Sequence, residues 1–191
     1  DPQGNATSGL GIRDTESRPT LYQLLLGECS HEEAIRETTL SNLELIPSNQ
    51  DLIGAEVELL QNESREYILR ETIRRCGAKY KYIILDCPQS LGLLTLNSLA
   101  AATSVLIPVQ CEYYALEGLK SVLETLDIVK QNLNPGLRIE GFLLTMFDPR
   151  NRLCHQVAEE IRDYFRTDVF EAVIPRNVRL SECPSHGLPI I

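Results

Sequence analysis

Two aspartates and three arginines stand in polar segments of the sequence, and all of them except Asp1 follow apolar runs. Asp86 comes directly after the run 82–85, and Asp1 opens a polar, glycine-containing segment. The three arginines are Arg150, Arg176 and Arg179. An acid at the carboxyl end of a buried strand can hold the water shell of a magnesium ion, and arginines bind phosphate oxygens. The combination indicates a site that handles phosphate, although Asp86 alone fits a simple turn cap equally well.

The elements that must position these residues are predicted by hydrophobic periodicity. Short apolar or alternating runs near residues 43, 82, 105, 140 and 170 are typical of strands. Helical periodicity separates them, and the longest helical pattern, 52–75, is interrupted near 62–64. Alternating strands and helices predict an α/β fold, a three-layer, doubly wound, mostly parallel sheet. The loops after its strands gather at one edge, where such folds bind ligands. No interdomain linker is evident, so residues 1–191 are expected to form a single domain.

Composition narrows the class of protein. The formal net charge of −9 argues against a general binder of polyanions, although a local basic patch remains compatible with it. No apolar run is long enough to cross a membrane, and no signal peptide opens the chain. The six cysteines form no CxxC pair, which favours free thiols in a reducing, cytoplasmic setting over zinc or disulfides.

Several longer motifs resemble the ParA/Soj family of chromosome- and plasmid-partitioning ATPases, within the deviant Walker A group that also contains MinD. The resemblance covers the whole chain and rests on DPQGNATSGLG, YIILDCP, LGLLTLNSLAAA, IPVQCEYYALEGL, LLTMFDPR and IPRNVRLSECPSHG. It implies a P-loop NTPase fold that uses ATP and Mg²⁺. It is closer to the chromosomal Soj type than to MinD.

The sequence departs from the family pattern in one respect that matters for catalysis. The family begins with a strand and a KGGVGKTT phosphate loop, whereas no GK[ST] occurs in these residues. The resemblance therefore implies an internal fragment, truncated at both ends, that lacks the P-loop and the last helix. Such a fragment is expected to bind ATP poorly and to be inactive as an ATPase by itself.

The resemblance implies catalytic roles for two residues. Asp1 matches the switch aspartate that orients the attacking water, and Asp86 matches the Walker B acid, which reaches Mg²⁺ through a water molecule. Taken as an isolated residue, Asp1 is merely a terminal acid.

The resemblance also implies binding roles for five residues. Pro175, Asn177 and Met146 match the wall that holds adenine, although core packing is the commoner role of a lone methionine. Arg150 and Arg179 match positions that contact DNA without sequence preference. Solvated arginines are the simpler interpretation of that pair.

The intact protein is then expected to form an ATP-dependent homodimer, to bind nucleoid DNA in the cytoplasm, and to be released when a ParB-type partner stimulates hydrolysis. Residues 112–114 lie in the loop expected near the subunit interface. Two alternatives stay open. A MinD-like cell-division regulator would carry an amphipathic membrane helix after residue 191, and a non-catalytic interaction protein would have its start codon just before Asp1.

Overall fold

The computed structural model describes residues 1–76 and 79–189, and its contacts divide the chain into two compact units. The first unit contains residues 1–101 and the segment from Arg179 onward, and the second contains residues 102–178. The expectation of a single domain stays a prediction. No helix of the described residues is both long and apolar enough to cross a membrane.

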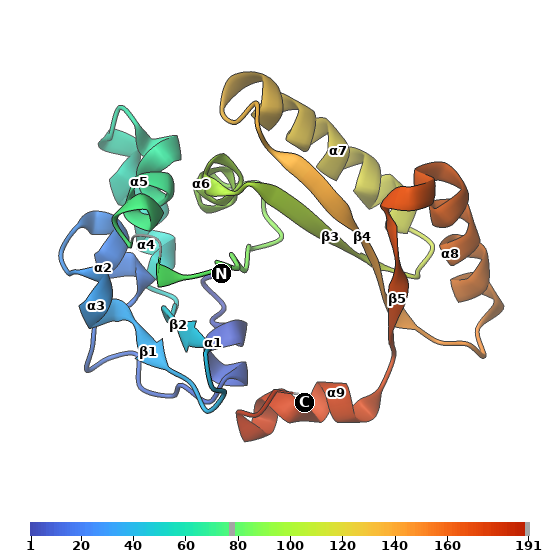
Figure 1. Ribbon diagram of the computed structural model, residues 1–191, viewed down its shortest axis with the longest axis horizontal. Helices are drawn as coiled ribbons and strands as arrows, with labels where there is room; N and C mark the ends of the chain where they lie inside the picture. Colours follow the sequence, from blue (N-terminus) through green and yellow to red (C-terminus); the bar gives the residue numbers. More distant parts are fainter. Residues whose placement is uncertain (77–78, 190–191) are drawn as a thin grey trace. The chain divides into compact units, whose positions relative to one another are not determined.

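The second unit is a parallel three-stranded sheet in the order β3-β4-β5. Its strands are β3 (Ser104–Gln110), β4 (Arg138–Phe147) and β5 (Val169–Pro175). Helices α7 (Ala115–Asn132) and α8 (Arg152–Phe165) are the crossovers between them, and η4 (Arg166–Asp168) precedes β5. Sequential order and right-handed crossovers place both helices on the same face of the sheet, as Figure 1 shows. These elements confirm the α/β fold predicted for this half of the chain.

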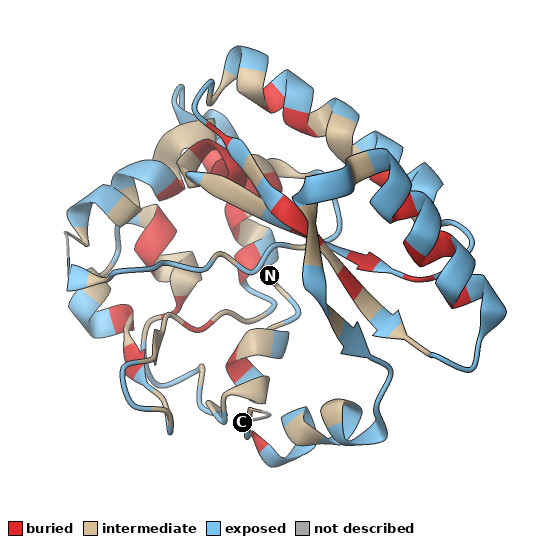
Figure 2. Ribbon diagram, turned by 45° about the vertical axis from the view of Figure 1, so that its right-hand side comes forward, coloured by how far each residue is buried: buried red, intermediate tan, exposed pale blue. Residues whose placement is uncertain are grey.

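The core of the second unit lies between that face and the two helices. In α8 the buried residues recur every three or four positions, as the amphipathic pattern predicts. Figure 2 shows the same division, with buried segments on the inner sides of the helices and exposed segments on the outer sides. The most deeply buried residues of this core are Leu126, Val129, Phe142, Leu144, Cys111 and Ile161.

Two of the predicted strands do not join this sheet. The prediction of a buried strand at 82–85 is wrong, because that segment pairs with no strand among the described residues, and Ile84 is 88% exposed. The predicted strand near 43 is reduced to β2 (Glu44–Leu45), which pairs antiparallel with β1 (Arg36–Glu37). β-branched residues favour extended backbone, but a strand also needs a neighbour that completes its hydrogen bonds.

The first unit is built mainly from short helices, and the starts of α2 and α3 are capped by side chains. Thr20 and Gln23 form a capping box at the start of α2, and Ser30 and Glu33 form another at α3. The predicted break in the long helical pattern is confirmed, since residues 62–64 separate η1 from η2. The elements are α1 (Asn5–Gly9), α2 (Leu21–Leu26), α3 (His31–Ala34), α4 (Leu52–Glu58), η1 (Leu59–Gln61), η2 (Arg65–Tyr67), α5 (Ile68–Arg75), α6 (Leu93–Ala101), α9 (Val178–Glu182) and η5 (Cys183–His186).

A buried asparagine joins two helices of this unit. Asn97 of α6 accepts a hydrogen bond from the backbone N–H of Leu69 at 3.1 Å. Its amide group donates to the carbonyls of Arg65, at 2.7 Å, and Leu93, at 3.0 Å. The Leu69 N–H belongs to the first turn of α5, where the helix itself supplies no acceptor. Asn97 therefore fixes the start of α5 against α6.

We expect Asn97→Ala to lower the free energy of unfolding by about 3 kcal/mol, because it leaves buried donors and acceptors without partners. Chemical denaturation followed by circular dichroism measures the change. Asn132→Ala is the matched control, since Asn132 is exposed and donates only within α7, to Ile128. Equal stability of the two variants would contradict the role given to Asn97.

Candidate functional site

The structure brings the two candidate catalytic aspartates together within the first unit. The backbone nitrogen of Asp1 lies 3.1 Å from the carbonyl oxygen of Asp86. The side chain of Asp1 accepts a hydrogen bond from the backbone N–H of Gln3 at 3.1 Å, which closes a turn. Two residues 85 positions apart in the sequence are thus neighbours at the same point of the fold.

The polar segment that begins with Asp1 is held in place by Ser48. The Ser48 hydroxyl donates to the carbonyl of Asp1 at 2.6 Å, and its backbone N–H donates to the hydroxyl of the buried Thr7 at 3.0 Å. Gly4 has a φ of 64°, and a Cβ there would lie 2.8 Å from the Ser48 carbonyl oxygen. Only glycine therefore fits this approach without strain. These contacts restrict where the Asp1 carboxylate can point.

The Asp86 carboxylate is exposed and accepts no hydrogen bond from the described residues. It follows directly after the extended segment 82–85. An exposed carboxylate that accepts no hydrogen bond from protein groups is the type of oxygen ligand that magnesium or its bound water takes. The donor chemistry at Asp86 therefore fits the predicted magnesium role.

In the second unit, Met146 lies at an irregularity near the carboxyl end of β4. The register changes from Leu144 paired with Val173 to Phe147 paired with Pro175, so β4 carries one extra residue there. Met146 adopts a φ of 53°, which is unusual for a non-glycine residue, and its side chain is exposed. Such bulges redirect side chains and are common beside ligand sites.

The neighbouring strand presents the other two residues predicted to hold adenine. Pro175 ends β5 opposite Phe147, and Asn177 follows two residues later. The backbone N–H of Arg176 donates to the carbonyl of Phe147 at 3.0 Å and extends the pairing by one residue. Pro175 and Asn177 are both exposed. The structure thus places Pro175 and Met146 at adjacent strand ends.

Arg150 is engaged by an aspartate that the sequence analysis did not single out. Its guanidinium donates to both carboxylate oxygens of Asp148, at 3.0 and 2.9 Å, and its backbone N–H donates to the same group. These hydrogen bonds lower the pKa of Asp148 to about 2, so the pair stays charged near neutral pH. The Arg150 side chain is nonetheless 88% exposed. The guanidinium faces solvent but is already paired.

Arg179, the second arginine predicted to contact DNA, is an exposed residue of α9 and belongs to the first unit. Asp1 and Asp86 belong to that unit as well, whereas Met146, Arg150, Pro175 and Asn177 belong to the second unit.

Sequence reasoning missed two residues of this site. Asp148 stands two residues before Arg150 in a turn, a spacing at which an acid commonly bonds to nearby backbone and side chains, so the signal was available. Ser48 offered no signal, because its partners lie 41 and 47 positions away in the sequence.

Comparison with known proteins places these observations in context. Residues 1–139 match a family described as an AAA domain. The whole chain is 59% identical to the chromosome partitioning protein ParA of Myxococcus xanthus, and spans 68% of it. It is 54% identical to the sporulation initiation inhibitor protein Soj of Bacillus subtilis, again over its whole length and over 76% of that protein.

A solved structure agrees in fold and carries ligands. It is a cobyrinic acid a,c-diamide synthase from Mycobacterium smegmatis with a bound ATP analogue and magnesium. It superposes with a TM-score of 0.86 at 37% identity, over 93% of this chain and 70% of that one.

Proposed function

The chain belongs to the ParA/Soj family of chromosome-partitioning ATPases, and from this premise we propose how its residues serve the ATP-driven cycle. It has the α/β fold of the P-loop NTPases, although the phosphate loop itself is not among these residues, and the cofactors of the family are ATP and Mg²⁺. The roles of individual side chains, the dimer, the DNA contact and the partner are our proposals.

Asp86 and Asp1 have different roles near the phosphates of ATP. Bound magnesium neutralises phosphate charge during transfer. The Asp86 carboxylate accepts hydrogen bonds from water in the metal shell and so fixes that shell in position. Asp1 orients the water that attacks the terminal phosphate. The observation that carries this proposal is the 3.1 Å contact between the Asp1 nitrogen and the Asp86 carbonyl, which puts both acids at one point of the first unit.

Met146, Pro175 and Asn177 form the wall of the adenine pocket. An exposed thioether and a proline at adjacent strand ends offer apolar surface on which a purine can pack, and the asparagine amide can bond to the ring edge. The bulge at Met146 turns the side chain out of the regular alternation of β4.

The ATP-bound form is a homodimer that binds nucleoid DNA in the cytoplasm without sequence preference. The dimer proposal is supported by Tyr113 and Tyr114, whose rings pack edge to face and which are both more than 70% exposed. Arg150 and Arg179 contact DNA phosphates. A ParB-type partner stimulates hydrolysis, which separates the subunits and releases the DNA.

We expect the double variant Arg150→Ala and Arg179→Ala to bind non-specific duplex DNA at least about tenfold more weakly in the presence of ATP and Mg²⁺. Loss of two phosphate contacts should also reduce the slope of log affinity against log salt by about 2 per subunit. Fluorescence anisotropy of the intact protein with labelled DNA measures both quantities. ATP hydrolysis serves as the check that the variant is folded.

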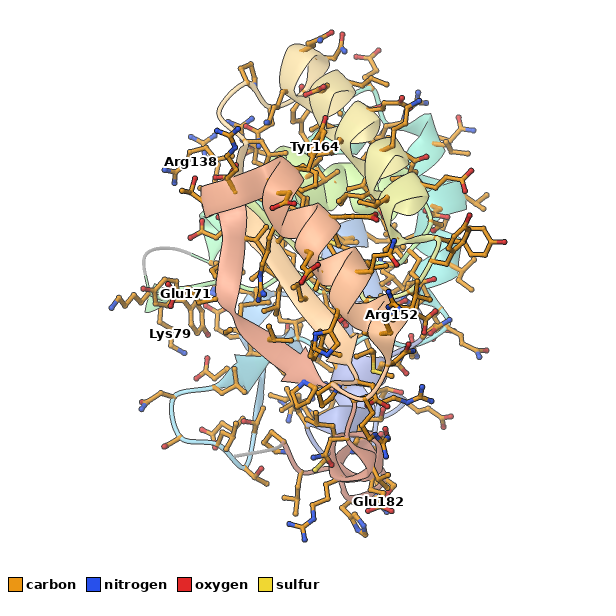
Figure 3. The ribbon with its side chains drawn as sticks, turned by 90° about the vertical axis from the view of Figure 1, so that its right-hand side faces the viewer. Lys79, Arg138, Arg152, Tyr164, Glu171 and Glu182 are labelled. Carbon is orange, nitrogen blue, oxygen red and sulfur yellow. The ribbon has the colours of Figure 1, made fainter. Side chains whose placement is uncertain are left out.

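Arg138→Ala is the matched control. Arg138 is exposed and begins β4. Arg150 lies just before α8, which begins at Arg152, and Figure 3 shows Arg138 and Arg152 at opposite ends of the sheet. The control should bind DNA like the wild type. The DNA proposal fails if the control and the double variant lose affinity equally, or if binding does not depend on ATP.

A further inference from the structure

Two glycines from distant parts of the sequence meet where η5 packs against α1 (Figure 1). Gly11 follows α1 with a φ of 80°, and Gly187 ends η5 with a φ of 64°. A Cβ added at Gly187 would lie 2.7 Å from the Cα of Gly11, and one added at Gly11 would lie 3.0 Å from the Gly187 carbonyl oxygen. The two backbones are therefore in direct contact, at a distance that leaves no room for a side chain.

The α1 side of this contact is tied to Asp1. The N–H of Gly4, just before α1, donates to the carbonyl of Asp1 at 3.0 Å. The N–H of Gly11 donates to the carbonyl of Ser8 at 3.0 Å and closes the turn after α1. Ser48 holds Asp1 and the middle of α1 through the hydrogen bonds described above. Gly11 is thus fixed relative to the segment that begins with Asp1.

The η5 side of the contact leads directly to α9, which carries Arg179. The N–H of Gly187 donates to the carbonyl of Pro184 at 3.1 Å. The Ser185 hydroxyl donates to the carbonyl of Glu182, the last residue of α9, at 2.7 Å. Hydrogen bonds therefore connect Gly187 to the end of α9, and all of these residues belong to the first unit.

We propose that Gly11 and Gly187 are positioning residues for DNA binding, a role that rests on the DNA contact proposed above for Arg179. Their contact sets α9, and with it Arg179, in a defined place relative to the Asp1 segment. A helix of five residues is too short to be stable by itself, so its place depends on what the adjoining chain packs against. Among the described elements, α1 is the main packing partner of η5.

A methyl group at Gly187 must displace one of the two backbones. α1 is anchored by the buried Thr7, whose hydroxyl accepts from the Ser48 N–H at 3.0 Å and donates to the Ser48 carbonyl at 3.2 Å. The main packing partner of η5 is α1 itself. We therefore expect η5 and α9 to move while Asp1 keeps its place.

Gly187→Ala in the intact protein should bind non-specific duplex DNA at least about threefold more weakly in the presence of ATP and Mg²⁺, because Arg179 no longer meets its phosphate. ATP hydrolysis without DNA should change less than about twofold, since Asp1 is held separately. Fluorescence anisotropy with labelled DNA and phosphate release measure the two quantities. A purely structural defect would lower both together.

Gly27→Ala is the matched control. Gly27 ends α2 with a φ of 75°, and a Cβ there meets no atom within 4 Å. Both replacements put alanine into left-handed backbone, so only the close contact distinguishes them. The control should bind DNA like the wild type. Thermal unfolding confirms that each variant is folded, and Gly11→Ala, with its longer 3.0 Å approach, is the milder variant if Gly187→Ala is not.

A double-mutant cycle tests whether the contact acts through Arg179. Gly187→Ala should cause no further loss of DNA affinity when Arg179 is already alanine, because the two losses then have one cause. Additive losses would overturn the proposal, and so would equal losses by Gly187→Ala and Gly27→Ala. Weaker DNA binding by Arg179→Ala but not by the glycine variants would refute the positioning role and leave the DNA contact standing. Unchanged binding by Arg179→Ala would refute the DNA contact itself, and the positioning role with it.

Discussion

Replacing Asp86 with asparagine in the intact protein is expected to reduce Mg²⁺-dependent ATP hydrolysis by at least about 100-fold, which corresponds to about 2.7 kcal/mol of transition-state stabilisation. The amide keeps the size of the side chain but removes its charge and one acceptor oxygen. Because the Asp86 carboxylate is exposed and accepts no hydrogen bond from the described residues, its replacement should leave the fold intact. Phosphate release measures the rate.

The metal dependence separates a magnesium role from a structural one. With a fluorescent ATP analogue, Asp86→Asn should bind more weakly than the wild type in the presence of Mg²⁺ and equally in EDTA. Asp168→Asn, at an exposed acid of η4, is the control and should behave like the wild type. If Asp86→Asn hydrolyses ATP within about threefold of the wild type, the magnesium role is wrong.

Replacing Asp1 with alanine is expected to lower hydrolysis by about 100-fold while ATP binding changes less than about threefold, because a group that orients water acts in the chemical step rather than in binding. The ATP-bound dimer should then persist on DNA. Single-turnover hydrolysis and nucleotide binding, measured side by side, give the two quantities.

A second variant is needed to separate the charge of Asp1 from its role in the turn, since the same carboxylate accepts a hydrogen bond from the Gln3 N–H. Asp1→Asn keeps an acceptor for that turn and removes the charge. We expect it to be as defective as Asp1→Ala. Recovery of hydrolysis by the asparagine variant would show that the turn matters and that the charge does not.

Periodicity predicted the second unit well because its elements are long. The apolar strands predicted near 105, 140 and 170 each match an element of the structure. The segment 82–85 has strand-like residues, yet whether it pairs depends on a neighbour that local sequence does not specify. The same reason limits β2 to two residues.

Site details that depend on two elements at once could not be predicted. The φ of 53° at Met146 follows from the register of β4 against β5, which no single segment encodes. Ser48 forms hydrogen bonds with Asp1 and Thr7, and Asn97 with Leu69. These bonds likewise join residues that only the folded chain brings together. The family motifs identified which residues to examine, and the structure supplied their contacts.

Arg150 must give up its bonds to Asp148 before its guanidinium can bind a DNA phosphate. A guanidinium that already holds a carboxylate with two parallel bonds cannot simply be added to a phosphate, because it must exchange one anion for another. Release of Asp148 removes the guanidinium bonds that lower its pKa and leaves a charged carboxylate that must be hydrated again, which makes this contact less favourable than one from an unpaired arginine. Only an anion that offers two oxygens in the guanidinium plane competes well for it, so the pair favours a closely seated phosphate over diffuse attraction to a polyanion.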